Sequence, residues 1–197
     1  MAAVSVTNQL SALHDVFDKI KEVYYVARPN TPLASLATFD MEWPVISDGV
    51  SFDTGEPSIT KVKLTSGETW TTMSEAGDPT ITFQVGSFSP EIADLFLNKE
   101  TEEEVAMTNT VNGVTFGGIG YNLEPKKINC GIFMVAENRE VAIYMPNVEV
   151  FANMVIEEDR PAYFNANITP LVSDTGDTLF ILRPTGAIRR RTAKTTL

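Results

Sequence analysis

One histidine, His14, and one cysteine, Cys130, are the residues whose side chains most often carry catalysis or bind metals. A Ser-His-Asp or Cys-His catalytic site would have to include His14, and a His/Cys metal site needs more ligands than these two residues supply. We therefore expect no catalytic centre, no metal and no cofactor, and interpret His14 as a surface or partly buried residue of a helix. A single cysteine also excludes an intrachain disulfide, which fits assembly in a reducing cytoplasm.

Two Asp-Thr-Gly triplets, beginning at Asp53 and Asp174, offer a second kind of chemistry. In aspartic proteases this tripeptide supplies two carboxylates that share one proton, because both cannot ionise at close range. Those enzymes place a small residue after the triplet, whereas Glu56 and Asp177 follow it here. The same residues form Asx turns readily, so we expect two turns, with an acid hydrolase as the less favoured alternative.

Two further segments have the composition of ligand-binding loops. The Gly-Gly-Ile-Gly run at residues 117–120 is not followed by the Lys-Ser/Thr pair that completes a phosphate loop, so we expect a turn or bulge. The acidic run at residues 102–104 lacks the alternating oxygen ligands and the glycine of a calcium loop, so we expect a solvated acidic face. Neither segment predicts an enzyme.

Charge is distributed unevenly along the 197 residues. The net charge is −11, and residues 183–197 carry five basic and no acidic side chains, so the first 182 residues carry −16. An acidic surface of this kind repels nucleic acid, since phosphate contacts need lysine and arginine. The basic tail, with Arg189, Arg190 and Arg191, is either a disordered tail or a contact for an acidic neighbour.

The elements that would position such residues are mostly strands. Residues 80–85 alternate with period two and lead into the best-marked short helix, at about residues 90–98. There Ser89 is a good N-cap, Pro90 suits the first helical position, and Ile92, Leu95 and Phe96 share one face. A strand that runs directly into one capped helix predicts an α+β, mainly β fold in a single domain over residues 1–197.

Helical spacing of apolar residues also predicts an N-terminal helix over residues 9–21. Strand patterns occur at 23–27, around 60–64 and 70–73, in a hairpin at 132–144, and later at 148–156, 164–169 and 179–182. Residues 40–57 are predicted to be an extended loop. Because this segment holds several large apolar residues, among them Trp43 and Phe52, it either folds back on the body or contacts another subunit.

Four segments resemble those of bacteriophage major tail tube proteins: the strand-to-helix unit at residues 82–96, the preceding residues 63–70, the Met-Pro-Asn-Val-Glu-Val run at 145–150, and Phe-Asn-Ala-Asn-Ile-Thr-Pro-Leu at 164–171. The resemblance implies a β-sandwich or barrel-like fold of antiparallel sheets with a flanking helix. It also implies that the protein is not an enzyme. Copies would form stacked rings, usually hexamers, in a hollow virion tube that is assembled in the host cytoplasm.

The same resemblance implies partners and contacts. The main partner would be the protein itself, with tape-measure, terminator and baseplate or sheath proteins as neighbours, DNA as non-adhering cargo, and no membrane. We expect Trp43, Phe52, Arg189, Arg190 and Arg191 at inter-subunit contacts. Another virion or secretion-tube component, such as a tail terminator, a capsid-associated protein or a type VI tube subunit, is the alternative.

Overall fold

Antiparallel strands predominate in the part of the chain that the structure describes, and one short α-helix accompanies them there. The computed structural model describes residues 17–101 and 103–184. The strands are β1 (Ile20–Val26), β2 (Met41–Trp43), β3 (Val45–Asp53), β4 (Ser58–Lys63), β5 (Thr69–Glu75), β6 (Thr80–Val85), β7 (Asn98–Lys99), β8 (Val105–Ala106), β9 (Gly117–Gly118), β10 (Tyr121–Asn122), β11 (Ile128–Ala136), β12 (Ala142–Glu157), β13 (Arg160–Pro170) and β14 (Phe180–Leu182). The helices are α2 (Pro90–Phe96) and the 3-10 turn η1 (Leu33–Ser35). The α+β, mainly β prediction is confirmed.

Eight strands form the main sheet, in the order β2-β1-β11-β12-β13-β6-β3, with β14 on the first part of β12. The other strands pair two by two, as β4-β5, β7-β10 and β8-β9. The hairpin predicted at residues 132–144 is the turn between β11 and β12, where Val135 pairs with Ala142. The later strand patterns correspond to β12, β13 and β14.

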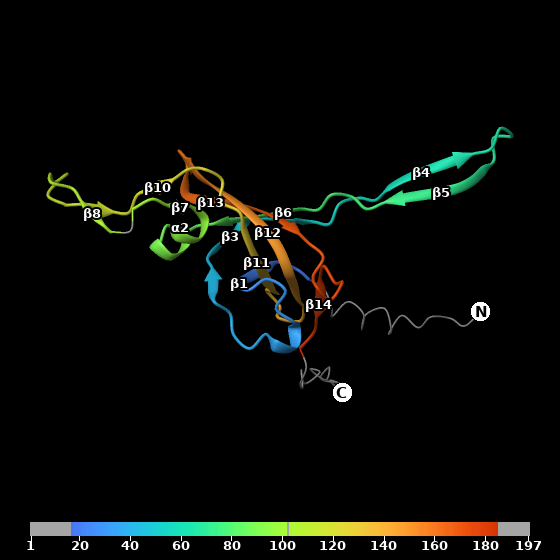
Figure 1. Ribbon diagram of the computed structural model, residues 1–197, viewed down its shortest axis with the longest axis horizontal. Helices are drawn as coiled ribbons and strands as arrows, with labels where there is room; N and C mark the ends of the chain where they lie inside the picture. Colours follow the sequence, from blue (N-terminus) through green and yellow to red (C-terminus); the bar gives the residue numbers. More distant parts are fainter. Residues whose placement is uncertain (1–16, 102, 185–197) are drawn as a thin grey trace, which may run out of the picture.

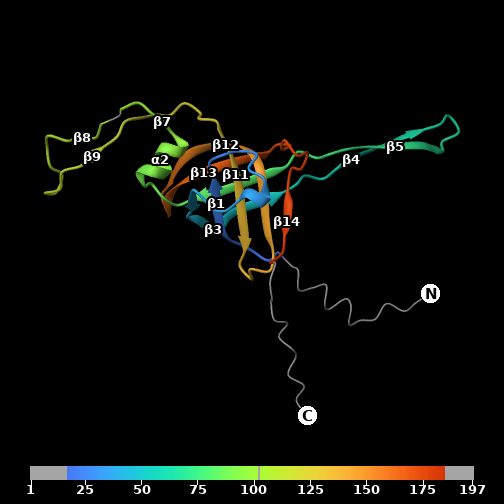
Figure 2. The same cartoon turned by 60° about the horizontal axis from the view of Figure 1, so that its bottom comes forward.

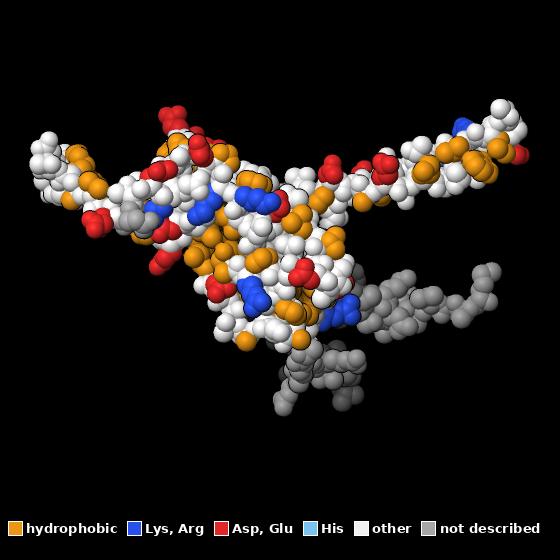
Figure 3. Space-filling view, viewed as in Figure 1, with side chains coloured by type: hydrophobic (Ala, Val, Ile, Leu, Met, Phe, Trp, Pro, Cys, Tyr) orange, Lys and Arg blue, Asp and Glu red, His pale blue; other side chains and the backbone are white. Residues whose placement is uncertain are grey.

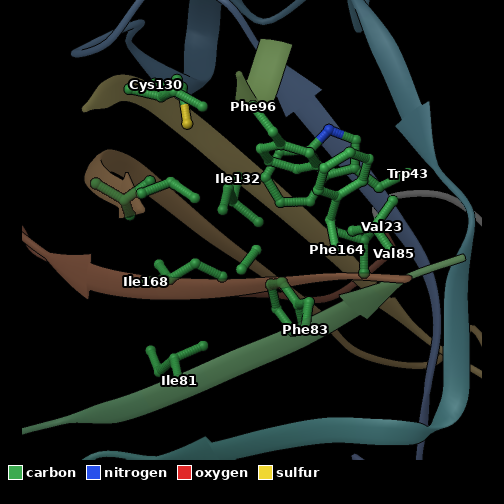
Figure 4. Close-up of a cluster of buried hydrophobic side chains, with 14 of the residues drawn as sticks. Val23, Trp43, Ile81, Phe83, Val85, Phe96, Cys130, Ile132, Phe164 and Ile168 are labelled. Carbon is green, nitrogen blue, oxygen red and sulfur yellow. The ribbon is translucent and has the colours of Figure 1, made fainter. Parts of the chain in front are cut away.

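The core lies between α2 and one face of this sheet (Figure 4). Alternate residues of β6 are buried, as the period of two predicts. Trp43 packs edge-on against Phe96, with ring centroids 5.3 Å apart, and Phe96 lies 5.3 Å from Phe164. Aromatic side chains from three separate elements thus fix how the helix sits on the sheet.

Helix α2 begins as its sequence predicts. The Ser89 hydroxyl accepts a hydrogen bond from the Ile92 amide at 3.4 Å, and Pro90 occupies the first turn. The helix ends at Phe96, because Leu97 is already extended and the chain continues into β7. Ile92 and Phe96 are buried, so the predicted apolar face is the one that meets the core.

Two predicted elements differ from the structure. Of the expected helix at residues 9–21, residues 9–16 lie outside the described residues; the prediction is wrong over its last residues, where 17–19 are not helical and β1 begins at Ile20. Pairing with β11 overrides the helical spacing there, as local propensity yields to tertiary contacts. The expected loop at 40–57 contains β2 and β3, because Trp43 pairs with Val23 and buries its side chain.

Two arms leave the body in opposite directions (Figure 1). One is the β4–β5 hairpin, and the other is the segment from β7 to β10, which carries β8 and β9 at its far part. A second view shows the same arrangement, with both arms extending past the sheet (Figure 2). The sheet and α2 therefore form a packed body, and the arms are additions to it.

Candidate assembly surfaces

The Asp-Thr-Gly triplets form turns in the structure. The Gly55 amide donates to Asp53 Oδ1 at 2.9 Å, which is an Asx turn, and Gly55 has a φ of 80°. At the second triplet the Gly176 amide donates to the Ser173 carbonyl at 2.9 Å. Among the described residues no hydrogen bond joins Asp53 to Asp174, so the arrangement gives no support to a shared-proton dyad.

Cys130 is a core residue with no exposed surface. Burial raises the pKa of its thiol to about 12, which keeps it protonated and unreactive at neutral pH. His14 lies outside the described residues. Over residues 17–101 and 103–184 no group of three or more His, Cys, Asp or Glu side chains is placed to hold a metal ion.

The glycine segment and the acidic run both belong to the second arm. Gly117 and Gly118 form strand β9, paired with β8, so the predicted turn or bulge is wrong at these two residues. Glu103 and Glu104 are exposed, as a solvated acidic face requires. None of these groups forms a site with catalytic geometry.

The β4–β5 hairpin exposes apolar side chains on both of its faces. Its register pairs Thr60 with Met73 and Val62 with Thr71, which places Met73 on one face. Lys61 lies on the other face by alternation, and Trp70 lies beside Lys63 at a bulge, where two residues of β5 oppose one residue of β4. Met73 is 61% exposed and Trp70 is 70% exposed. Within residues 17–101 and 103–184, the hairpin therefore has no covered side.

Two lysines accompany Trp70 on its face of the hairpin. Lys61 and Lys63 are the only basic residues between Arg28 and Lys99. In the described part of the chain neither lysine has an acidic partner within ion-pair distance. The arm thus carries these two cations beside apolar groups, with Glu68 in its turn and Glu75 at the end of β5, while most charges on the body are acidic (Figure 3).

The second arm ends in a tight turn and is also apolar at its far part. Val111 and Val114 exchange two backbone hydrogen bonds of 2.9 and 3.0 Å around Asn112 and Gly113, both of which have positive φ. This is the geometry that an Asn-Gly pair favours. The exposed apolar side chains of this arm are Val105, Met107, Val111, Val114 and Phe116.

Polar contacts fasten the root of the second arm to α2. The Tyr121 hydroxyl donates to Asp94 Oδ1 at 2.6 Å, and this bond raises the pKa of Tyr121 to about 12. Lys126 Nζ donates to the Asp94 carbonyl at 2.5 Å and to the Leu97 carbonyl at 3.1 Å. Lys126 thereby satisfies two carbonyls at the end of the short helix, and Tyr121 ties the root of the arm to the helix.

A groove of about 370 Å³ lies beside this root, between residues 123–125 and the outer half of β12. Its walls include Leu123, which is 75% exposed, and Phe151 and Met154, which are 39% and 42% exposed. Phe151 interrupts a polar sheet face, because its cross-strand neighbours in register are Asn167, then Thr82 and Ser51. The groove is therefore a local apolar surface in polar surroundings.

The predicted inter-subunit residues have three different outcomes. Trp43 is 2% exposed and belongs to the core, so its predicted contact with a neighbouring subunit is wrong and the fold-back alternative holds for it. Phe52 is partly buried in the edge strand β3, and its contact stays a prediction. Arg189, Arg190 and Arg191 lie outside the described residues.

Sequence reasoning missed the surfaces that the structure presents most openly. The strand patterns around Thr60 and Trp70 were correct, but alternation gave no sign that neither face is covered. A signal was available in Trp70, since a tryptophan among threonines and lysines is costly to leave in water. Leu123, Phe151 and Met154 carried no such signal, because their groove forms only when distant segments meet.

A scan of protein-family models gives no match to this sequence, and a search of curated proteins gives none either. Across the described residues, none of the helices has the length and apolar character needed to cross a membrane.

Proposed function

We propose that this chain is a structural virion protein that assembles with copies of itself into stacked rings, forming the hollow tube of a bacteriophage tail. The observation that carries this proposal is the pair of arms that leave the body in opposite directions with uncovered apolar side chains. A subunit built in this way is complete only when its arms contact other subunits.

The energetics of the arms support contact with other chains. Moving one large apolar side chain from water to a buried site is worth about 1.5–3 kcal/mol. The β4–β5 hairpin alone exposes Ile59, Leu64, Trp70 and Met73. Because an isolated two-stranded hairpin is marginally stable in water, coverage of these side chains would also stabilise the hairpin itself.

The directions of the arms favour a repeating tube over a terminal component. A tail terminator ends a tube, so it needs an assembly surface of this kind on one side, whereas a tube subunit needs one on each side. The main sheet also ends in the nine-residue strand β3, whose one hydrogen-bonded neighbour among the described strands is β6. Joining such edges between subunits around a ring would remove an aggregation hazard.

The charge of the body suits passage of DNA without adhesion. The first 182 residues carry a large negative charge, and the sheet face around Thr82, Gln84, Asn165 and Asn167 carries amides and hydroxyls in register. Nucleic-acid affinity comes mainly from lysine and arginine contacts to phosphate. A channel lined by acidic or uncharged polar groups would let the polymer slide.

Electron microscopy of the purified full-length protein at increasing concentration tests the proposal. We expect rings and stacked tubes with an open channel, and no retention of linear DNA by the protein at physiological salt. A particle that stays monomeric at every concentration would contradict the proposed function.

A further inference from the structure

The outer half of β12 has an open backbone edge. Pairing of β12 with β11 ends at Val150, opposite Ile128, whereas pairing with β13 continues to Glu157. In the described structure, residues 151–157 therefore have a strand on one side only. A row of unpaired N–H and C=O groups is a template for a strand from another chain.

Side chains on both faces of this edge are apolar and accessible. Phe151 and Met154 are separated by three positions, so they point to opposite faces of the strand, and both line the groove together with Leu97 and Leu123. A strand added here would thus meet apolar groups above and below the sheet. This requirement is met by a hairpin with apolar side chains on both faces.

The β4–β5 hairpin has that property. Met73 lies on one face and Trp70 on the other, and both strands of the hairpin have an outer edge without a partner among the described residues. In a sheet extended by this hairpin, each of the two side chains would cover one face of the groove region. The two surfaces match, because the edge of β12 and the β4–β5 hairpin each carry apolar side chains on both faces.

Their charges are also complementary. Glu124 lies in the wall of the groove, and Glu158 and Asp159 form the tip of the β12–β13 hairpin, where acidic side chains gather (Figure 3). Glu157 already pairs with Arg160, but Glu158 and Asp159 have no ion pair in the described part of the molecule. The unpaired Lys61 and Lys63 of the hairpin match these unpaired acids.

We infer that the β4–β5 hairpin of one copy docks along the open edge of β12 in another copy, with Trp70 and Met73 on either side of the extended sheet and Lys61 and Lys63 near Glu158 and Asp159. This inference rests on the proposed function and names the surfaces that join the subunits. The hairpin extends away from the groove of its own chain, so the occupant is a second molecule (Figures 1 and 2). A contact between two different surfaces is heterologous, which generates closed rings or open stacks.

Charge reversal tests the pairing. In the full-length protein, Lys61→Glu with Lys63→Glu should raise the critical concentration for assembly by about tenfold or more. Adding Glu158→Lys and Asp159→Lys to the same chain should restore assembly. The matched control is Lys19→Glu with Lys21→Glu, which makes the same change in net charge at another exposed strand end and should leave assembly unchanged.

A mixing experiment identifies the contact directly. Met73→Cys protein mixed with Met154→Cys protein should form a cross-linked heterodimer with a short bis-maleimide, whereas Met73→Cys mixed with Ile181→Cys should not. The native Cys130 is buried, so it does not compete for the reagent. Thermal unfolding of each variant establishes that its body is folded.

The outcomes separate this inference from the proposed function. If the wild-type protein forms tubes but the lysine reversal has no effect, the acidic reversal does not restore assembly, or the Ile181 control cross-links equally well, the hairpin–groove pairing is wrong and the tube proposal stands. If the wild-type protein forms no assembly at all, the proposed function fails with it.

Discussion

The β11–β12 hairpin and the β4–β5 hairpin share a strand pairing and have opposite environments. Both are antiparallel pairs of strands that the sequence predicts. In β11 the side chains of Cys130, Ile132 and Met134 are completely buried, whereas every apolar residue of β5 is exposed. Alternation defines the faces of a strand, but other parts of the assembly decide whether a face is covered. The first hairpin is completed within the chain, and the second one is not.

Deletion of the uncovered hairpin should have the largest effect on assembly. Replacing residues 58–75 by a short Gly-Ser turn should abolish assembly completely, because the main contact surface is lost. The body should keep its unfolding free energy within about 1 kcal/mol, since the hairpin packs on nothing there. Sedimentation velocity and urea unfolding measure the two effects. Loss of the folded body would show that the hairpin belongs to the core after all.

Two methionines, one in each hairpin, allow the stability contributions of the two environments to be compared. Met134→Ala should lower the unfolding free energy by about 2–5 kcal/mol, because it leaves a cavity in a packed interior. Met73→Ala should change the same quantity by no more than about 0.5 kcal/mol, since that side chain is already in water. Urea denaturation at a concentration below assembly gives both values. Equal losses would contradict the contrast between the two hairpins.

A substitution in the turn of the second arm should have a smaller effect, confined to the stability of the arm tip. Gly113 has a φ of 80°, so Gly113→Ala should destabilise the arm tip locally by about 1 kcal/mol. Gly118→Ala is the control, because nothing lies within 4 Å of an added Cβ and its φ lies outside the positive range. Amide exchange at Val111 and Val114 measures the change. Equal exchange in both variants would show that the tight turn does not hold the tip together.

The smallest predicted effect depends on pH. Because the pKa of Tyr121 is raised from 10.0 to about 12 in the folded protein, its bond to Asp94 stabilises the arm root fully below pH 10. This stabilisation is lost as the pH rises from 10 to 12. Tyr121→Phe should therefore cost about 0.5–1 kcal/mol at pH 8, allowing for solvent screening.

The measurement is the difference in unfolding free energy between wild type and Tyr121→Phe, followed from pH 8 to pH 12. Other tyrosines titrate in both proteins and cancel from this difference. We expect the difference to vanish near pH 12. A difference that is constant over this range would contradict the assignment of the pKa shift to the bond with Asp94.

Local signals in the sequence were sufficient where the chain completes its own contacts. The cap at Ser89, the alternation in residues 80–85 and the Asn112-Gly113 turn all correspond to the structure, because each depends on neighbouring residues. The errors occurred at Ile20 and Trp43, where pairing with a distant strand decides the local conformation. Interactions between segments far apart in sequence carry no local pattern.

The assembly surfaces were harder to predict for the same reason. Trp43 was expected at a subunit contact because it is large and apolar in a turn-rich segment, but distant strands enclose it. Trp70 lies in a strand pattern that gives no sign of exposure, yet no strand of the described structure covers it. Trp43 is buried by strands that are distant in sequence, whereas Trp70 stays exposed.

Hydrogen exchange in the β4–β5 hairpin shows whether other subunits cover this arm. The amides of residues 58–75 should exchange within seconds in the dispersed protein and should be protected by about a hundredfold or more in the assembled protein. Those of β11 should stay protected in both states. If the protein assembles and the hairpin amides still exchange as they do in the dispersed protein, other subunits do not cover this arm and the account is wrong.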